Sequence, residues 1–231
     1  MKLPACRAFS NGDSIRYSDP EGPGQTGATL QLLKVGYPIG QFFSLMYAGK
    51  DASGVSQFYK RDKSLTTNPS IGTDYFYVGN AQPKLLMGWN NTLRYKKFDL
   101  NIFFRGVFGH KIFNATRADL SYVTAATANN ILKSAANDKI NDNRNSYYST
   151  RYIEKGDYVR LDNATLSYTF SKPVKGVNSL RLYTTVNNLF TITKYQGIDP
   201  EINQGGVSPG IDYNNFYPKT RTIMFGLNVS F

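Results

Sequence analysis

Polar side chains capable of binding recur at alternate positions in several long segments of this sequence. The clearest examples are Arg94, Asn101, Arg105, Arg181 and Asn187. Guanidinium and amide groups form directional hydrogen bonds with hydroxyl, carbonyl and carboxylate groups. Because apolar residues separate these positions, the pattern predicts one hydrophilic surface. That surface contacts either another segment of the same protein or a ligand, and segment contact is the preferred interpretation.

Residues that could carry catalysis or hold a metal are sparse. His110 is the only histidine and has no second histidine or cysteine near it, which predicts a solvated loop. Asp199 and Glu201 flank Pro200 and could form an acid–base pair, but no partner base or nucleophile accompanies them, which favours a turn. The glycine-rich residues 205–210 follow no strand–helix pattern and predict a loop. We therefore expect no catalytic residue, no metal, no cofactor and no enzymatic activity.

The net charge of +11 raises the question of a nucleic-acid partner. Basic residues are mostly scattered singly, and Lys60-Arg61 and Lys96-Lys97 are the densest pairs. A nucleic-acid interface needs a basic patch or stripe, and none is visible. The basic residues are expected to lie on loops and on a polar surface, and no nucleic-acid partner is expected.

Strict alternation between apolar and polar residues predicts β-strands. It is clearest at the end of the chain, where Ile223, Phe225, Leu227, Val229 and Phe231 occupy every second position. The same parity predicts strands at 85–95, 98–108, 158–170 and 180–190, and more weakly at 39–48. Each strand should therefore have an apolar face and a mostly polar face, with Phe103 as an exception.

The predicted strands are long, at about ten residues or more, whereas strands of soluble proteins average about 5–6 residues. A strand that spans a membrane needs about 9–11 residues, while a transmembrane helix needs about 18 or more apolar residues in succession. No such apolar run occurs in this sequence. The sequence thus predicts an all-β protein, an antiparallel transmembrane β-barrel fragment of about six strands.

Short and long connections alternate between these strands. Lys96-Lys97 and 171–178 are short, whereas 49–83, 109–156 and 191–220 are long. Outer-membrane barrels have short periplasmic turns and long extracellular loops. Aromatic residues should gather at the end with the short turns, as a girdle at the lipid headgroups formed by Tyr95, Phe98, Tyr168, Phe170 and Phe231. Within the second long connection, 125–140 could form a short helix.

Residues 1–34 are rich in Gly, Pro, Ser and Asp and predict a loop or ragged N-terminal end. The remaining residues, 35–231, are predicted to hold the strands. Cys6 is the only cysteine, so no internal disulfide can form. No apolar signal segment precedes the strands, although an outer-membrane protein requires one.

The order of several motifs resembles the C-terminal end of SusC/RagA-type TonB-dependent outer-membrane transporters. The matching segments include Val35-Gly-Tyr-Pro-Ile-Gly40, Gly79-Asn-Ala-Gln-Pro-Lys84 and Gly156-Asp-Tyr-Val-Arg-Leu161. They continue with Asn187-Asn-Leu-Phe-Thr-Ile-Thr193 and Tyr217-Pro-Lys-Thr-Arg-Thr222, which leads to Phe231. Family members often carry an acidic loop before the second motif. Here Asp51-Ala-Ser-Gly54 lacks the spaced oxygen ligands that calcium needs, so no metal is expected.

The resemblance implies a large barrel with a plugged lumen in the outer membrane of a Gram-negative bacterium. It implies import of glycans or peptides, energised by TonB, with a SusD-like surface lipoprotein as partner. The residues that would face the lumen or plug are Arg94, Asn101, Arg105, Arg181 and Asn187. The residues expected to contact outer-membrane lipid or lie in the girdle are Trp89, Tyr95, Phe98, Tyr168, Phe170 and Phe225, and Phe231 would serve as the C-terminal barrel-assembly signal.

Six strands cannot close a membrane barrel, since the smallest have about eight. The sequence is therefore expected to be a fragment that needs an N-terminal plug and further barrel strands, and that aggregates on its own. Two alternatives remain. One is a soluble β-sandwich that binds carbohydrate through tyrosine-rich loops. The other is a small standalone porin, which fails on strand number unless chains assemble.

Overall fold

The computed structural model describes residues 14–17, 29–123, 126–127, 130–138, 140–142, 147–202, 208–213 and 217–231. The chain divides into two compact units that interleave along the sequence. One unit comprises residues 84–108, 157–194 and 217–231, and the other comprises the remaining segments. Cys6 and residues 205–207 of the glycine-rich segment 205–210 lie outside the described residues.

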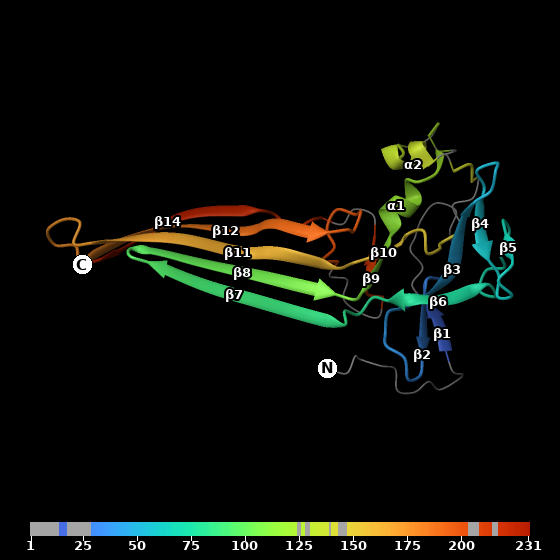
Figure 1. Cartoon of the computed structure of the whole chain (residues 1–231), viewed down its shortest axis with the longest axis horizontal. Helices are drawn as coiled ribbons and strands as arrows, with labels where there is room; N and C mark the ends of the chain where they lie inside the picture. The colour runs from blue at the N-terminus through green and yellow to red at the C-terminus, as the bar shows by residue number, and fades with distance from the viewer. Residues whose placement is uncertain are drawn as a thin grey trace. The chain divides into compact units, whose positions relative to one another are not determined.

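The first unit is a single antiparallel sheet with the strand order β14-β12-β11-β8-β7 (Figure 1). Its strands are β7 (Leu85–Tyr95), β8 (Phe98–Phe108), β11 (Tyr158–Ser171), β12 (Ser179–Thr193) and β14 (Thr222–Ser230). Five of the predicted strands are confirmed, two with identical bounds. They contain 9 to 15 residues each, so every strand reaches the about 9–11 residues that a membrane-spanning strand needs.

Two tight connections join strands at the same end of this sheet. Lys96 and Lys97 separate the paired residues Tyr95 and Phe98, and Lys96 adopts a left-handed backbone with φ of +54°. At the same end Ser171 pairs with Ser179, and Ser179 pairs with Ser230 of β14. The predicted short turns are thus confirmed.

The second unit contains short strands and two short helices. The strands are β1 (Ser14–Tyr17), β2 (Gln31–Lys34), β3 (Gln41–Lys50), β4 (Ser56–Tyr59), β5 (Leu65–Thr66), β6 (Tyr75–Asn80), β9 (Lys111–Asn114), β10 (Ile153–Lys155) and β13 (Ile211–Asp212). The helices are α1 (Ala115–Asp119) and α2 (Lys133–Asp138), and α2 falls within the predicted helical segment 125–140. No helix in the described part of the chain is long and apolar enough to cross a membrane.

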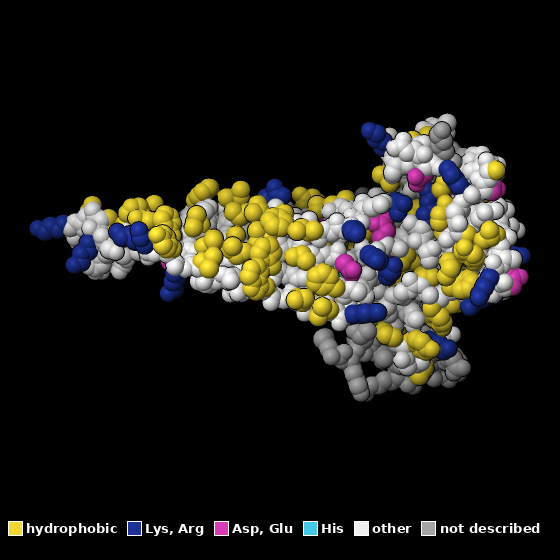
Figure 2. Space-filling view, viewed as in Figure 1, with side chains coloured by type: hydrophobic (Ala, Val, Ile, Leu, Met, Phe, Trp, Pro, Cys, Tyr) yellow, Lys and Arg dark blue, Asp and Glu magenta, His cyan; other side chains and the backbone are white. Residues whose placement is uncertain are grey.

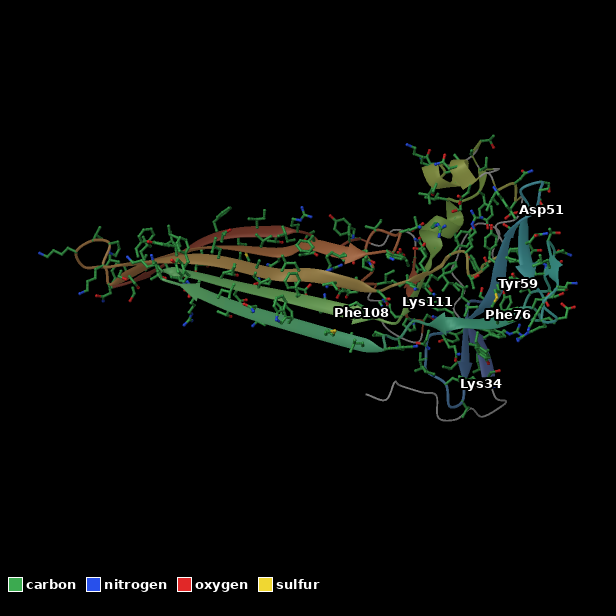
Figure 3. All side chains as sticks on the ribbon, viewed as in Figure 1. Lys34, Asp51, Tyr59, Phe76, Phe108 and Lys111 are labelled. Carbon is green, nitrogen blue, oxygen red and sulfur yellow. The ribbon has the colours of Figure 1, made fainter. Side chains whose placement is uncertain are left out.

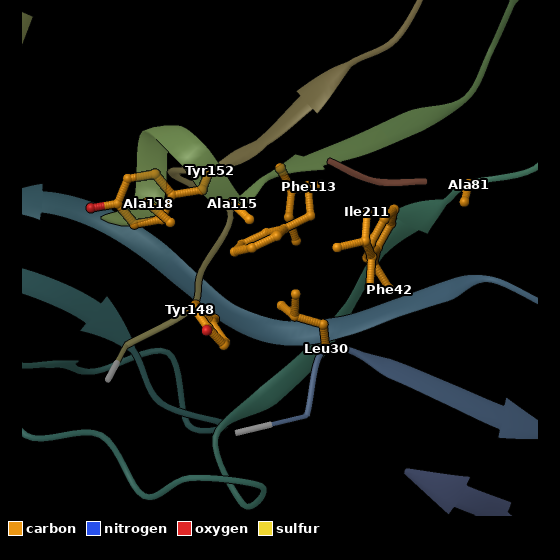
Figure 4. Packing of buried hydrophobic residues seen from close by; sticks show 10 residues of the cluster. Leu30, Phe42, Ala81, Phe113, Ala115, Ala118, Tyr148, Tyr152 and Ile211 are labelled. Carbon is orange, nitrogen blue, oxygen red and sulfur yellow. The ribbon is translucent and has the colours of Figure 1, made fainter. Parts of the chain in front are cut away.

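The core of this second unit comes mostly from segments that were predicted to be loops, together with the predicted strand 39–48. Leu30, Phe42, Phe113, Tyr148 and Ile211 are buried in one cluster although they are far apart in sequence (Figure 4). The long connections are therefore folded. Within residues 1–34, where only loop was predicted, β1 and β2 are strands. The predicted boundary at residue 35 stays a prediction.

The sixth predicted strand was assigned to the wrong sheet. Strand β3 pairs with β2, β4 and β6 and belongs to the second unit. The neighbouring residues Phe42, Phe43, Ser44 and Leu45 are all buried, so both faces of this strand are covered. A strand with two covered faces gives only a weak alternating pattern, because both parities tolerate apolar residues.

Candidate functional site

The register of the five-stranded sheet separates its side chains into two faces. Trp89 of β7 lies opposite Phe104 of β8, which lies opposite Leu161 of β11 and, through it, Phe190 of β12. One position along, Asn90 pairs with Phe103 and Thr92 with Asn101. Residues of one parity therefore share a face across all paired strands. The alternation predicted from sequence is therefore confirmed by the register.

Cross-strand polar contacts connect the side chains of the hydrophilic face. Arg94 and Asp99 form an ion pair with Nε and Oδ1 3.0 Å apart. The Asn101 amide donates to Oδ1 of Asn90 at 3.1 Å and to Oγ1 of Thr92 at 2.9 Å. Arg94 and Asn101, both predicted from sequence to lie on the polar face, thus each make a polar contact between β7 and β8.

A second group of contacts links β11 with β12 on the same face. The Asn163 amide donates to Oδ1 of Asn187 at 2.8 Å, and the hydroxyls of Thr165 and Thr185 are 2.9 Å apart. Arg181 donates from Nη2 to Oγ of Ser167 at 2.9 Å. The hydrogen bonds satisfy polar groups between strands and hold the side chains in place, so the face is a preorganised polar surface.

Arg105 lies where the sheet is irregular. The register shifts between Leu161 and Asn163, which leaves Asp162 as the inserted residue of β11. Asp162 accepts two bonds from Arg105, at 2.6 Å from Nε and 3.2 Å from Nη2. Arg105 also donates to the Tyr158 hydroxyl at 3.3 Å and lies opposite Arg160 in the register. The bulge thus aims a carboxylate at the guanidinium group of Arg105.

A hollow of about 600 Å³ opens beside this bulge. Its lining combines the Arg105–Asp162 pair with Asn187, Asn188, Tyr217 and Lys219. Asn188 has a left-handed backbone with φ of +52°, and its amide donates to the carbonyl oxygens of Lys219 at 2.9 Å and Thr220 at 3.3 Å. Two residues selected from sequence, Arg105 and Asn187, therefore lie together at a concave polar site.

The opposite face is apolar and exposed. Trp89 and Phe104 stack with ring centroids 5.5 Å apart, while Trp89 remains 58 % exposed and Phe225 84 % exposed. Hydrophobic side chains cover most of the visible face of this sheet (Figure 2). Soluble monomers rarely expose contiguous apolar surface of this extent, which indicates contact with a membrane or another protein.

Aromatic residues gather where the tight turns lie. Phe98 contacts Tyr168, and Tyr168 contacts Phe170, each pair with ring centroids 4.6 Å apart and an edge-to-face angle of 66°. Tyr95 lies opposite Phe98, and Phe231 follows the last residue of β14. All five residues therefore lie at the end of the sheet where the tight turns are, as predicted. Side chains project from both faces of the strands up to Phe108 at the other end of β8 (Figure 3).

The structure shows the surroundings of two candidates that were weighed from sequence, His110 and Asp199. His110 was predicted to be solvated, which is wrong, because it is only 8 % exposed and a side chain on Gly156 would collide with its ring. Asp199 accepts a bond from the backbone N–H of Glu201 at 2.9 Å, which confirms the predicted turn. Across the residues that the structure describes, no group of three or more His, Cys, Asp or Glu side chains could hold a metal.

Sequence reasoning missed several members of the polar face. Asp99, Asp162 and Arg160 were not selected, although Asp162 forms the two-point bond with Arg105. Alternation assigned Asp99 to the correct face, but no sequence signal marked the extra residue that places Asp162 beside Arg105. Arg160 is 1 % exposed. Nothing in the sequence distinguishes it from the other scattered basic residues.

Comparison with known proteins places the chain among outer-membrane receptors, although no protein-family model matches it. It is 30 % identical to TonB-dependent receptor P3 of Formosa agariphila over 232 residues, covering 87 % of this chain and 23 % of that receptor. It is 29 % identical to TonB-dependent receptor SusC of Bacteroides thetaiotaomicron over 215 residues, covering 87 % of this chain and 20 % of SusC.

A solved structure shares the fold. The structure of the RagAB peptide importer in the closed-closed state aligns with a TM-score of 0.75 at 20 % identity. The alignment covers 97 % of this chain and 25 % of the importer chain. The chain thus spans about a fifth to a quarter of the length of the proteins it matches.

Proposed function

This chain belongs to the SusC/RagA-type TonB-dependent receptors, and we propose that it forms part of the barrel wall of an outer-membrane nutrient importer. The apolar face of its five-stranded sheet contacts outer-membrane lipid. The polar face, with Arg94, Asn101, Arg105, Arg181 and Asn187, faces the lumen and the plug domain. The second unit supplies folded extracellular loops. The role requires no catalytic residue.

The segregation of the two faces across five long paired strands is the observation that carries this proposal. An outward apolar face and an inward polar face on strands of this length are typical of outer-membrane barrels. The inward side chains bond to one another across strands, which suits a wall against which a plug or a solute rests. The aromatic cluster at the turn end supports the proposal, because barrels carry aromatic girdles at the lipid headgroups.

The open edges of the sheet support a role within a larger barrel. Among the described residues, β7 and β14 each pair with only one strand of the sheet. Unsatisfied backbone groups cost several kcal/mol each in hydrocarbon, so both edges need further strands. The proposed partners are therefore the plug and the remaining barrel strands, TonB acting through the plug side, and a SusD-like surface lipoprotein. The cargo is a glycan or a peptide.

A soluble β-sandwich that binds carbohydrate is not favoured. A sandwich covers the apolar face of each sheet with a second sheet about 10 Å away. Here Trp89, Leu93, Phe225 and Leu227 of the outer strands are all more than half exposed. In a barrel wall, lipid would cover these residues, so no second sheet is needed.

Fractionation of cells that express the protein carrying this chain tests the proposal. The protein should remain in the outer-membrane fraction through a carbonate wash and should be extracted only by detergent. Removal of residues 84–231 by an in-frame deletion should abolish import while a plug-domain antibody still detects any remaining product. Recovery as a soluble monomer without detergent would contradict the membrane role and would favour the sandwich.

A further inference from the structure

Three basic residues that are far apart in the sequence lie along one row of aromatic rings in the second unit. Arg16 belongs to β1, Lys34 ends β2, and Arg61 lies in the connection between β4 and β5. Lys34 and Phe76, from the two ends of the row, are labelled in Figure 3. We call this group the basic–aromatic row, and its members are Arg16, Lys34, Tyr37, Phe43, Arg61, Phe76 and Tyr77.

Ring contacts connect the row along its length. The Lys34 Nζ lies 5.3 Å from the centroid of the Tyr37 ring, and the Tyr37 and Tyr77 rings are parallel with centroids 6.0 Å apart. Tyr77 contacts Phe43, its partner in the register, with centroids 5.0 Å apart. Tyr37 is 39 % exposed and Tyr77 is 43 % exposed. The tyrosine part of the row is therefore a surface that a ligand can reach.

Two guanidinium groups meet at the other end of the row. The Cζ atoms of Arg16 and Arg61 each lie 5.9 Å from the centroid of the Phe43 ring, within the range of a cation–π contact. Arg16 donates from Nη2 to the carbonyl oxygen of Gly72 at 3.0 Å, and Arg61 donates from Nε to that of Thr73 at 3.2 Å. Because the two carbonyls belong to consecutive residues, one turn holds both guanidinium groups.

The turn of residues 70–74 has a shape that fits Arg16. Gly72 has a left-handed backbone with φ of +82°, and a Cβ at this position would collide with Nη1 of Arg16. A residue with a side chain could therefore not occupy this position without moving the guanidinium. The Asp74 carboxylate closes the turn, because it accepts the backbone N–H groups of Ser70 at 2.8 Å and of Arg61 at 3.4 Å.

Two guanidinium groups on one turn match the chemistry of a phosphoryl group. A guanidinium has five N–H donors, so one that donates to a single carbonyl can still bind a ligand. A carboxylate has two oxygens, which one guanidinium can occupy in a two-point contact. A phosphate monoester has three terminal oxygens and a higher charge, so it can accept from two guanidinium groups at once. The exposed tyrosine rings provide an apolar surface for the organic part of the ester.

We propose that the arginine end of the basic–aromatic row binds the phosphoryl group of a phosphate ester. Arg16 and Arg61 bind the phosphoryl oxygens, Lys34 attracts the ligand from the other end of the row, and Tyr37 and Tyr77 contact its organic part. The site shares no residue with the polar face of the large sheet, and the proposal does not depend on the importer role. A lipid headgroup and a soluble ester carry the same phosphoryl group, so the experiment has one arm for each source.

Isothermal titration calorimetry of the protein that carries this chain, solubilised in dodecyl maltoside, tests the proposal. In the soluble arm, potassium phosphate and sodium acetate are titrated separately at low ionic strength, where charge interactions are screened least. In the lipid arm, the titrant is mixed micelles of dodecyl maltoside with phosphatidic acid, compared with micelles that contain diacylglycerol. These two lipids differ only by the phosphate group.

Four variants separate the geometry of the site from its charge. Arg16→Gln and Arg61→Gln each remove charge-assisted hydrogen bonds and should weaken phosphate binding by about 10-fold or more. Gly72→Ala should weaken it as well, because it displaces the Arg16 guanidinium without changing any charge. Gly176→Ala is the matched control, since Gly176 has a similar φ of +89° but no atom within 4 Å of an added Cβ. Lys133→Gln removes a charge from an exposed residue of α2 outside the row and should leave binding unchanged.

The expected result is binding of phosphate in at least one arm, and in the soluble arm about 10-fold or more tightly than acetate. Binding in the soluble arm alone identifies a soluble ester, binding of phosphatidic acid alone identifies a lipid headgroup, and either outcome supports the site. No phosphate-dependent binding in either arm, equal affinity for phosphate and acetate, or binding that both arginine variants leave unchanged would overturn the proposal. If Gly72→Ala does not fold, the two arginine variants still decide.

Discussion

Arg105 and Asp162 form a two-point ion pair at the only register shift in the large sheet as the structure describes it, with Nε 2.6 Å from Oδ2 and Nη2 3.2 Å from Oδ1. The inserted residue of β11 is the one that supplies the carboxylate. The ion pair therefore depends on the bulge, because the extra residue of β11 brings the Asp162 carboxylate within reach of Arg105.

A double-mutant cycle with Arg105→Met and Asp162→Asn measures the coupling free energy of this ion pair. Both side chains are about one-quarter exposed, so the pair is partly shielded from solvent screening. We expect a coupling free energy of about 1–2 kcal/mol for unfolding by urea in detergent micelles. The Arg94–Asp99 pair serves as the control, because Arg94 is 80 % exposed and its coupling should be below about 0.5 kcal/mol. Equal coupling in both pairs would contradict the account.

Lys96 should be strained in the tight turn between β7 and β8. Its φ of +54° lies in the left-handed region, which costs a residue with a side chain about 1 kcal/mol relative to glycine. Lys96→Gly is therefore expected to raise the free energy of unfolding by up to about 1 kcal/mol. The neighbouring Lys97→Gly is the control and should lower it, since Lys97 has no positive φ. Two variants that lower stability alike would disprove the strain.

Gly226 of β14 lies under the ring of Tyr183 of β12, its partner in the register. A Cβ at Gly226 would be 2.3 Å from the Tyr183 ring, whereas a Cβ at Gly88 would be 3.4 Å from Phe103. Gly226→Ala should therefore displace Tyr183 and destabilise the sheet by about 1–3 kcal/mol. Gly88→Ala should change stability by less than about 1 kcal/mol, because the contact is ordinary. Thermal unfolding of both variants in detergent provides the comparison, and equal effects would argue against the close approach.

Asp212 in the second unit should make stability fall as the pH rises. Burial raises its pKa, and the nearby Glu154 and Asp199 carboxylates add to the rise, although the Tyr195 hydroxyl donates a hydrogen bond to it. A raised pKa means that the folded state holds the proton more tightly. The stabilising contribution is full below the unfolded pKa of about 4 and is lost as the pH rises through the folded pKa.

Asp212→Asn mimics the protonated carboxyl and should remove this loss, so its stability gain over the parent should grow with pH from about 4 upward. Asp51 has the opposite sign, because the Ser53 hydroxyl and the Val55 N–H lower its pKa. Asp51→Asn should lose stability near neutral pH and regain it in acid. Denaturant unfolding followed across the pH range checks both, and a constant difference for Asp212→Asn would refute the raised pKa.

The sequence predicted the large sheet well because its strands have one apolar and one polar face. The bounds of β7 and β8 followed from alternation alone, and even Phe103, the exception, lies over Gly88 on the polar face. The second unit was missed because its strands are short and its core joins Leu30, Phe42, Phe113 and Ile211 from distant segments. Strand β3 gave only a weak alternating pattern because both of its faces are buried, and no sequence pattern marked the burial of His110.

The sequence predicted which side chains share the polar face of the large sheet. It did not predict the bulge in β11. Arg105 and Asn187 were placed correctly because parity alone fixes a face. Their meeting at one hollow depends on the register shift at Asp162 and on the left-handed Asn188, which no local pattern marks. Lumen, plug and lipid contacts of the selected residues stay predictions.

Spin-label accessibility along β8 tests most directly the claim that one face meets lipid and the other a polar interior. Labels at Asp99, Leu100, Asn101 and Ile102, introduced one at a time as cysteines in a Cys6→Ser background, would be studied in the membrane-embedded protein. Labels at 100 and 102 should collide more with oxygen, and labels at 99 and 101 more with a water-soluble nickel complex. Similar accessibility to the nickel complex at all four positions, or the reverse alternation, would contradict the account.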